Sequence, residues 1–310
     1  MVRLTSILLT LAPLLSAQFI SPPPTSDQIQ AILNQRLEQK QAVSLVAAIL
    51  DPQGKRTVAA GPAKPDAIFE LGSLSGTFTT LVLQTMVANG EVALTDTVSM
   101  YLPNIPSHGS KQITLLDLAT HTSGLPNLPL DFPPPGPNED PALAYTRYTD
   151  TQAMAFLASY QLTRDPGKLY EHSDLGIALL ARALVRRATV SYETLLRRRI
   201  LTPLGMNDTR IDLDEFQRAR LAPGHIYTAT GIQPRPSSDT GFFAPALGLH
   251  STAKDLLVFV SAYLNTPRPT CTLNSPPRWS PAVPSPTNCK RPSAGRFASP
   301  TSVSEKACAC

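Results

Sequence analysis

The composition of the chain changes abruptly at one point, and this change limits where a folded core can form. Beyond Asn265 the sequence is rich in Pro, Ser, Thr and Arg and has no apolar periodicity. All four cysteines lie in this last part, at positions 271, 289, 308 and 310. Because such a composition buries too little apolar surface to order a backbone, we expect residues 266–310 to form a disordered tail. The core must therefore be built before residue 266 and without disulfides.

The first residues have the order of a secretory signal. Met1 to Arg3 is a short basic start, followed by an apolar run from Leu4 to Leu15 and two small residues. The run is too short to span a bilayer. We expect residues 1–17 to be a signal peptide that is cleaved, or alternatively kept as an anchor, and the mature protein to be secreted or periplasmic without a stable membrane span.

The charge balance excludes some classes of partner and site. The net charge is only +4, and the arginines fall at the ends and outer faces of predicted helices, which favours solvated faces over nucleic-acid binding. The histidines at 108, 121, 225 and 250 show no helical pairing and no cysteine partners. We expect them to have structural roles, with His121 bonded to the backbone, and predict no metal site and no cofactor.

The periodicity predicts a helix packed on a β-hairpin at the start of the core. Ser26 is the expected N-cap of a helix whose apolar stripe includes Ile32. The strands Val43–Leu50 and Lys55–Ala60 follow, joined by a turn at residues 51–54 with Pro in its second and Gly in its fourth position. These are the only two strands that the sequence predicts clearly.

Later segments read mainly as helices. A mostly buried helix is predicted over Thr77–Asn89, with Gly90 as its stop and Ser73 just before it, where helix amides favour an anionic group. Further helices are predicted at 115–119, 151–159, 175–188, 192–200 and 253–264. The Pro-rich stretch 126–141 is either a surface excursion or a rim over a cleft.

Several segments carry a family resemblance because they occur together and in order. They are residues 69–75, 113–115 with 121–126, 166–167 with 173 and 176, 203–206 with 208–209, and 248–249 with 251–252 and 255–256. Read together, they resemble the serine β-lactamase and penicillin-binding-protein superfamily. The resemblance is greatest to the class C branch, which includes D-Ala-D-Ala carboxypeptidases and endopeptidases.

The resemblance implies a fold with an α/β lobe, an all-α lobe and a cleft at their junction. The α/β lobe, with an antiparallel sheet, would comprise residues 18–72 and 240–265, and the helical lobe residues 73–239. The family's later strands and its third motif, Lys-Thr-Gly or His-x-Gly, have no counterpart in the tail. We therefore expect the sheet to be incomplete at the C-terminus, through truncation or a frameshift.

The resemblance also implies acyl transfer by a serine, with Ser73 in the nucleophile position. The family places a Lys three residues after the Ser, on the same helix face, where it can take the hydroxyl proton. Here that position is Gly76. The lysine is absent, so a different base would be needed.

The second family motif, Tyr-x-Asn, aligns with His172-Ser173-Asp174. His172 could take the proton from Ser73, since imidazole titrates near neutral pH. Asp174 would stand in the substrate-binding position, where as an anion it would oppose carboxylate-bearing substrates. The alternative is decay of a site no longer used, whereas packing and structural roles are expected for Tyr170 and Ser173.

Two functions follow from these residues. The first is a serine hydrolase acting on small molecules or peptidoglycan peptides, namely D-Ala peptides, β-lactams or small esters, with activity lowered by the missing motifs. The second is a non-catalytic relative that binds such ligands. The sequence indicates neither the substrate nor the oligomeric state.

Overall fold

The computed structural model describes residues 23–136, 142–228, 231–235, 237 and 239–265. The expected signal peptide and the expected disordered tail lie outside these ranges. The helices are α1 Ser26–Glu38, α2 Leu74–Ala88, α3 Leu115–Ala119, α4 Leu143–Arg147, α5 Asp150–Ser159, α6 Asp174–Ala188, α7 Tyr192–Leu196, α8 Thr202–Leu204, α9 Glu215–Arg218, α10 Ala244–Leu247 and α11 Ala253–Asn265. The strands are β1 Leu45–Asp51, β2 Gly54–Ala60, β3 Ile68–Glu70, β4 Ser107–His108, β5 Lys111–Gln112, β6 Gly224–Thr228, β7 Gly231–Arg235 and β8 His250–Thr252.

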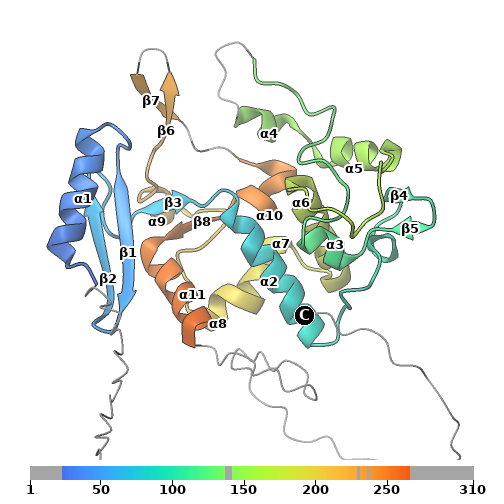
Figure 1. Ribbon diagram of the computed structural model, residues 1–310, viewed down its shortest axis with the longest axis horizontal. Coiled ribbons are helices and arrows are strands. Elements are labelled where there is room, and N and C mark those ends of the chain that lie inside the picture. The colour runs from blue at the N-terminus through green and yellow to red at the C-terminus, as the bar shows by residue number, and fades with distance from the viewer. Residues whose placement is uncertain (1–22, 137–141, 229–230, 236, 238, 266–310) are drawn as a thin grey trace, which may run out of the picture.

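The N-terminal unit is the expected helix on an antiparallel hairpin (Figure 1). β1 pairs with β2 from Leu45 opposite Ala60 to Asp51 opposite Gly54, and α1 packs on β2. The N-cap of α1 is Thr25, because its hydroxyl accepts a hydrogen bond from Gln28 N–H. The Gln28 side chain in turn accepts a hydrogen bond from Thr25 N–H. Ser26 was therefore the wrong N-cap by one residue, and Ile32 is 51% exposed instead of lying in an apolar interface.

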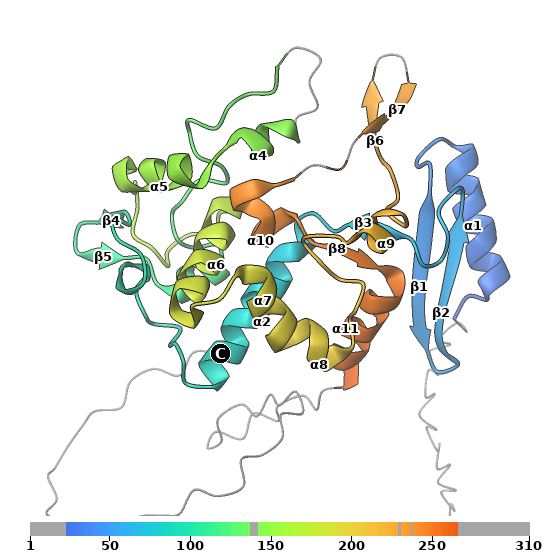
Figure 2. The same cartoon turned by 180° about the vertical axis from the view of Figure 1, so that it is seen from behind.

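The core lies among the helices in the middle of the chain (Figures 1 and 2). α2 contacts α6 and α10, and α3 contacts α6. Buried apolar side chains from different elements meet there, among them Phe78, Val82, Leu118 and Leu179. The predicted helices near 77–89, 115–119, 151–159, 175–188 and 253–264 are confirmed, and Gly90 takes the left-handed conformation (φ 68°) that ends α2.

β3 and β8 form a second antiparallel pair that the sequence did not indicate. Ile68 lies opposite Thr252 and Glu70 opposite His250, so the residues just before Ser73 are held against the segment that leads into α11. Each strand is only three residues long, which is too short for an alternating pattern to be visible. In the described part of the chain, strands pair only two by two.

The segment 73–239, expected to be all helical, also carries two hairpins. β4 pairs with β5, and β6 pairs with β7. The expectation of an all-helical segment is wrong in this detail, because these strands are short and have no alternating apolar pattern by which the sequence would predict them. Gly109, with a positive φ, lies in the turn between β4 and β5, and Gly231, also with a positive φ, is the first residue of β7. The lobe boundaries themselves stay a prediction.

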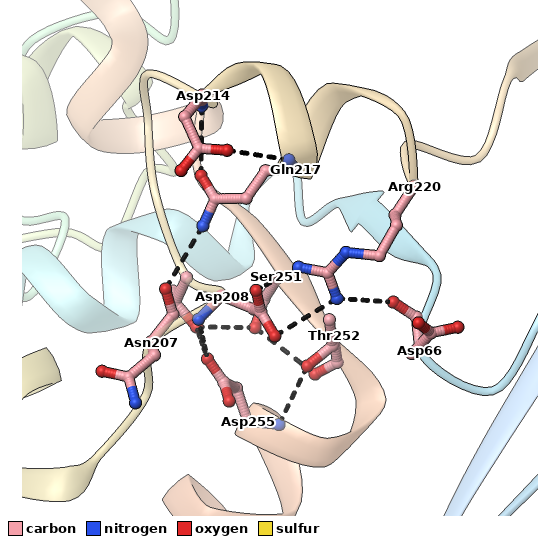
Figure 3. A network of polar contacts seen from close by, with 10 residues as sticks. Asp66, Asn207, Asp208, Asp214, Gln217, Arg220, Ser251, Thr252 and Asp255 are labelled. Atoms are coloured by element: carbon pink, nitrogen blue, oxygen red, sulfur yellow. Dashed lines mark hydrogen bonds and ion pairs between the residues drawn. The ribbon is translucent and has the colours of Figure 1, made fainter.

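Hydrogen bonds and an ion pair form a polar network that connects residues 207–220 to β8 and α11 (Figure 3). The Asp255 carboxylate accepts from Asp208 N–H at 2.9 Å and from the Thr209 hydroxyl at 2.8 Å. Arg220 forms an ion pair with Asp208 and donates to the Asp66 carbonyl at 3.2 Å. Since Thr209 is fully buried, this network is part of the packed structure.

Two further features bear on the expectations. Residues 126–136 of the Pro-rich stretch contain no helix or strand, and residues 137–141 lie outside the described ranges. None of the helices within the described residues has both the length and the apolar character that a membrane span requires.

Candidate functional site

Ser73 lies where the chain turns from β3 into α2, and its hydroxyl has no hydrogen-bond partner among the described residues. Ser73 is exposed and is the N-cap residue of α2, but its side chain makes no capping bond. Ser75, two residues later, is buried; it donates to the Gly72 carbonyl at 2.7 Å and accepts from Leu249 N–H at 3.0 Å. Of the two serines in this segment, Ser75 is therefore structural and Ser73 is available for chemistry.

The backbone around Ser73 leaves little for an anion to bind. The amides of Leu74, Ser75 and Gly76 donate to the carbonyls of Leu71, Gly72 and Ser73, respectively, at 2.9–3.3 Å. The expectation of free amides at the start of α2 is therefore not met at these three positions. The N–H of Ser73 itself has no partner among the described residues, so it can donate to an oxyanion formed at its own side chain.

His172 and Asp174 form a polar pair at the start of α6. His172 Nε2 lies 3.1 Å from Asp174 Oδ1, and the His172 side chain is 46% exposed whereas that of Asp174 is 9% exposed. The Asp174 position is fixed because its N–H donates to Asn127 Oδ1 at 3.0 Å. Ser173 caps α6 through Gly176 N–H and is completely buried, which confirms its structural role.

His121 joins this pair from a distant part of the chain. It follows α3, has a left-handed backbone (φ 56°), and its ring centroid lies 4.6 Å from that of His172. Nδ1 accepts from Ser173 N–H at 3.1 Å, as the expected backbone bond requires. The ring of Tyr170, a residue 65% exposed, lies edge-on to His121 at 5.8 Å.

Burial sets the charge states at this cluster. Burial, followed by the neighbouring His172, lowers the pKa of His121, which keeps its ring neutral and its Nδ1 able to accept. Burial raises the pKa of Asp174, against the opposing effect of His172. Asp174 is therefore an acid for which ionisation is costly and which depends on the imidazole for compensation.

One pocket brings these residues together. It has a volume of about 210 Å³. The residues that line it are Ser73, Gly76, Thr77, Thr80, Ala119, His121, His172, Asp174, Ile177 and Ala246. The three residues singled out in the sequence, Ser73, His172 and Asp174, thus share a pocket, and so does Gly76 of the altered motif.

Sequence reasoning missed the place of His121 at this pocket. Its turn, residues 121–126, belongs to the family resemblance, but the sequence predicts only a hydrogen bond to the backbone for its side chain. The positive φ of His121 is not visible in the sequence, and it is this conformation that accompanies the ring's position beside His172. Within the described ranges no three His, Cys, Asp or Glu side chains are grouped as a metal would require, and the absence of a cofactor stays an expectation.

The chain is similar to known proteins over most of its described length. The Beta-lactamase family model matches residues 29–286. The chain is 30% identical over 204 residues to the D-alanyl-D-alanine-carboxypeptidase/endopeptidase AmpH of Escherichia coli (strain K12), which covers 65% of this chain and 50% of that protein. It is 27% identical over 204 residues to a Beta-lactamase of Pseudomonas fluorescens, covering 66% and 52%.

Solved structures agree with the sequence matches. A crystal structure of Beta-lactamase/D-alanine Carboxypeptidase from Yersinia pestis, complexed with citrate, has a TM-score of 0.64 and 28% identity, covering 76% of this chain and 68% of that one. The fold is thus the β-lactamase/transpeptidase fold. The chain spans about half the length of the curated relatives that it matches. With the family model covering more than half of its residues, the chain belongs to the β-lactamase family.

Proposed function

We propose that the protein is a serine hydrolase that works by acyl transfer, with Ser73 as nucleophile and His172 as its base. The observation that carries the proposal is the shared pocket of Ser73, His172 and Asp174. Membership of a serine hydrolase family supports it. Since Gly76 stands in place of the family's lysine, the imidazole of His172 is the proton acceptor that the pocket offers.

The chemistry follows from the positions of these groups. Asp174 holds His172 through Nε2, and Nδ1 has no partner among the described residues, so that nitrogen can accept the Ser73 proton. Ser73 Oγ then bonds to the substrate carbonyl carbon, and the Ser73 N–H donates a hydrogen bond to the developing oxyanion. His172 returns the proton to the leaving group as the old bond breaks. A water molecule then attacks the acyl group on Ser73 with His172 again as the base, which releases the acid and restores the Ser73 hydroxyl.

The names of the relatives support two of the substrate classes expected from the sequence, β-lactams and D-Ala peptides, and small esters stay an expectation from the sequence. A specific observation favours the alternative of a ligand-binding relative without turnover. The Ser73 hydroxyl makes no hydrogen bond to His172 in the described structure, so the pair is not joined in the absence of substrate. Hydrogen bonds of this kind often tighten only when substrate binds, which is why we rank the hydrolase first.

The test is turnover of a chromogenic cephalosporin and of p-nitrophenyl butyrate by the wild-type protein, with Ser73→Ala and Ser107→Ala compared. Ser107 is an exposed serine on β4 and controls for loss of a surface hydroxyl. We expect hydrolysis of at least one of the two substrates, which Ser73→Ala abolishes and Ser107→Ala leaves unchanged. Ligand binding without any Ser73-dependent hydrolysis would support the binding relative instead.

A further inference from the structure

The pocket at Ser73 contains a fixed anion and no fixed cation. Among the described residues that line it there is no Lys or Arg, and Asp174 is its one carboxylate. His121, the more enclosed of the two imidazoles, is held in the neutral form by burial. Near neutral pH, the described lining therefore carries a net charge that is zero or negative unless His172 and Asp174 are both protonated.

The start of α6 would ordinarily attract an anion, but the chain itself occupies it. α6 has 15 residues, and Asp174 is its first residue, so a carboxylate already lies at the positive end of the helix. The first three amides are taken as well. Asp174 N–H and Leu175 N–H donate to the Asn127 side chain and carbonyl, and Gly176 N–H donates to the Ser173 hydroxyl. A substrate carboxylate finds no free amide at these positions.

The start of α2 offers no compensation, because its first three amides are used in turns and the N–H of Ser73 is needed for the reacting carbonyl oxygen. The residues next to the reacting groups are also apolar at the surface. Leu74, which follows Ser73, is 55% exposed, and Tyr170, which lies against His121, is 65% exposed. Apolar substrate groups can pack on these side chains.

We propose that the Ser73 pocket selects small neutral esters with apolar groups and rejects carboxylate-bearing substrates, and that Asp174 is the residue that rejects them. This inference rests on the proposed function, since it names the substrate class of the same site. Selectivity of this kind comes from a repulsive element built into the site. The family resemblance places an Asn at this position, so Asp174→Asn removes the charge while keeping the shape and an acceptor oxygen.

The test compares two activated esters of similar acyl length, p-nitrophenyl butyrate and mono-p-nitrophenyl succinate, with each rate divided by its spontaneous hydrolysis rate. We expect wild-type kcat/KM to favour the butyrate by at least about tenfold, and Asp174→Asn to reduce that preference about tenfold. Asp27→Asn is the matched control, because Asp27 also lies in the first turn of a helix, α1, and is exposed. Equal wild-type rates, or a preference unchanged in Asp174→Asn, would overturn the inference.

Failure of the hydrolase proposal itself would look different, since neither ester would then be turned over in a Ser73-dependent way. In that case the charge selectivity is measured by calorimetric titration with phenylboronic acid and 3-carboxyphenylboronic acid. Binding of the neutral boronic acid at least about tenfold more tightly would support the inference. Equal affinities, tighter binding of the carboxylate, or no binding of either compound would overturn it.

Discussion

Asp174 at the pocket and Asp255 in the network of Figure 3 are both buried aspartates, but the structure holds them in different ways. Taken as whole residues, Asp174 and Asp255 are 6% and 4% exposed, respectively, and burial raises the pKa of each carboxyl. Asp255 accepts from Asp208 N–H and from the Thr209 hydroxyl, two donors fixed by packing. The Asp174 carboxylate has only His172 as a hydrogen-bond partner among the described residues, and it lines a pocket.

Burial of an acid therefore does not by itself identify a site. The two aspartates differ in the groups that form hydrogen bonds to the buried carboxylate. At Asp255 they are neutral donors of the fold, whereas at Asp174 the partner is a titratable ring on the pocket wall. Asp255 should therefore matter for stability, and the Asp174–His172 pair for chemistry.

Removing the proposed base should have a greater effect than any other substitution considered for the pocket or the network. His172→Ala should lower kcat for p-nitrophenyl butyrate by about 10²–10⁴-fold, because a positioned general base is lost. The free energy of unfolding should fall by about 1–3 kcal/mol, because the buried Asp174 carboxylate loses its hydrogen-bond partner. Steady-state kinetics and urea unfolding measure both quantities. His225→Ala on β6 is the control, and a His172→Ala variant with full activity would remove His172 from the mechanism.

The next effect lies on the network side. Asp255→Ala should lower the free energy of unfolding by about 3 kcal/mol, because the Asp208 N–H loses its acceptor and the buried Thr209 hydroxyl keeps only Ser251 of its two side-chain partners. Asp255→Asn keeps one acceptor oxygen and should lose less. Urea titrations of the two variants measure the difference. A loss below about 1 kcal/mol in Asp255→Ala would show that the network is not a stability element.

Restoring the family's lysine should produce a moderate gain. Gly76→Lys places an ammonium three residues from Ser73 on the same helix face, and should raise kcat/KM at least about tenfold. A Cβ at Gly76 would meet only Ile177 side-chain atoms, at 3.6 and 3.7 Å, so the helix can accept the change. Gly76→Met controls for side-chain length and helix propensity. Equal activity in the Lys and Met variants would show that proton removal is not the limiting step.

The smallest effect tests the cost of the Asp174 charge. Burial raises the pKa of the Asp174 carboxyl in the folded protein above its usual 3.8, so ionisation of this carboxyl disfavours folding. The contribution of Asp174 to the free energy of unfolding is therefore fully present below pH 3.8. It is lost as the pH rises through the folded-state pKa. Asp174→Asn should therefore be more stable than wild type by about 1 kcal/mol at pH 7, and equal to it near pH 3. Urea unfolding at the two pH values tests this. A variant that is less stable at pH 7 would contradict the stated cause.

The elements that the sequence predicted well are those with an apolar pattern repeated over several turns or with characteristic turn residues. α2 and α6 have apolar stripes over several turns, and the turn at Gly54 fixes the β1–β2 hairpin. β3 and β8 could not be predicted, because three residues show no alternation and their pairing joins segments far apart in the chain.

The site was predictable to the extent that it follows motifs. Ser73, His172 and Asp174 align with family positions, and the structure brings them to one pocket. His121 was missed because its contribution depends on a left-handed backbone and on packing against His172, neither of which leaves a local sequence signal. The occupancy of the first α6 amides by Asn127 is likewise a tertiary contact between a loop and a helix.

The most direct test of the account is covalent labelling of the nucleophile. The wild-type protein and Ser73→Ala are each treated with a fluorophosphonate, and intact-protein and peptide mass spectrometry locate any adduct. We expect a single adduct on Ser73 in the wild-type protein and no adduct in Ser73→Ala. No labelling of the folded wild-type protein, or equal labelling of both proteins, would contradict the central claim that Ser73 is an activated nucleophile.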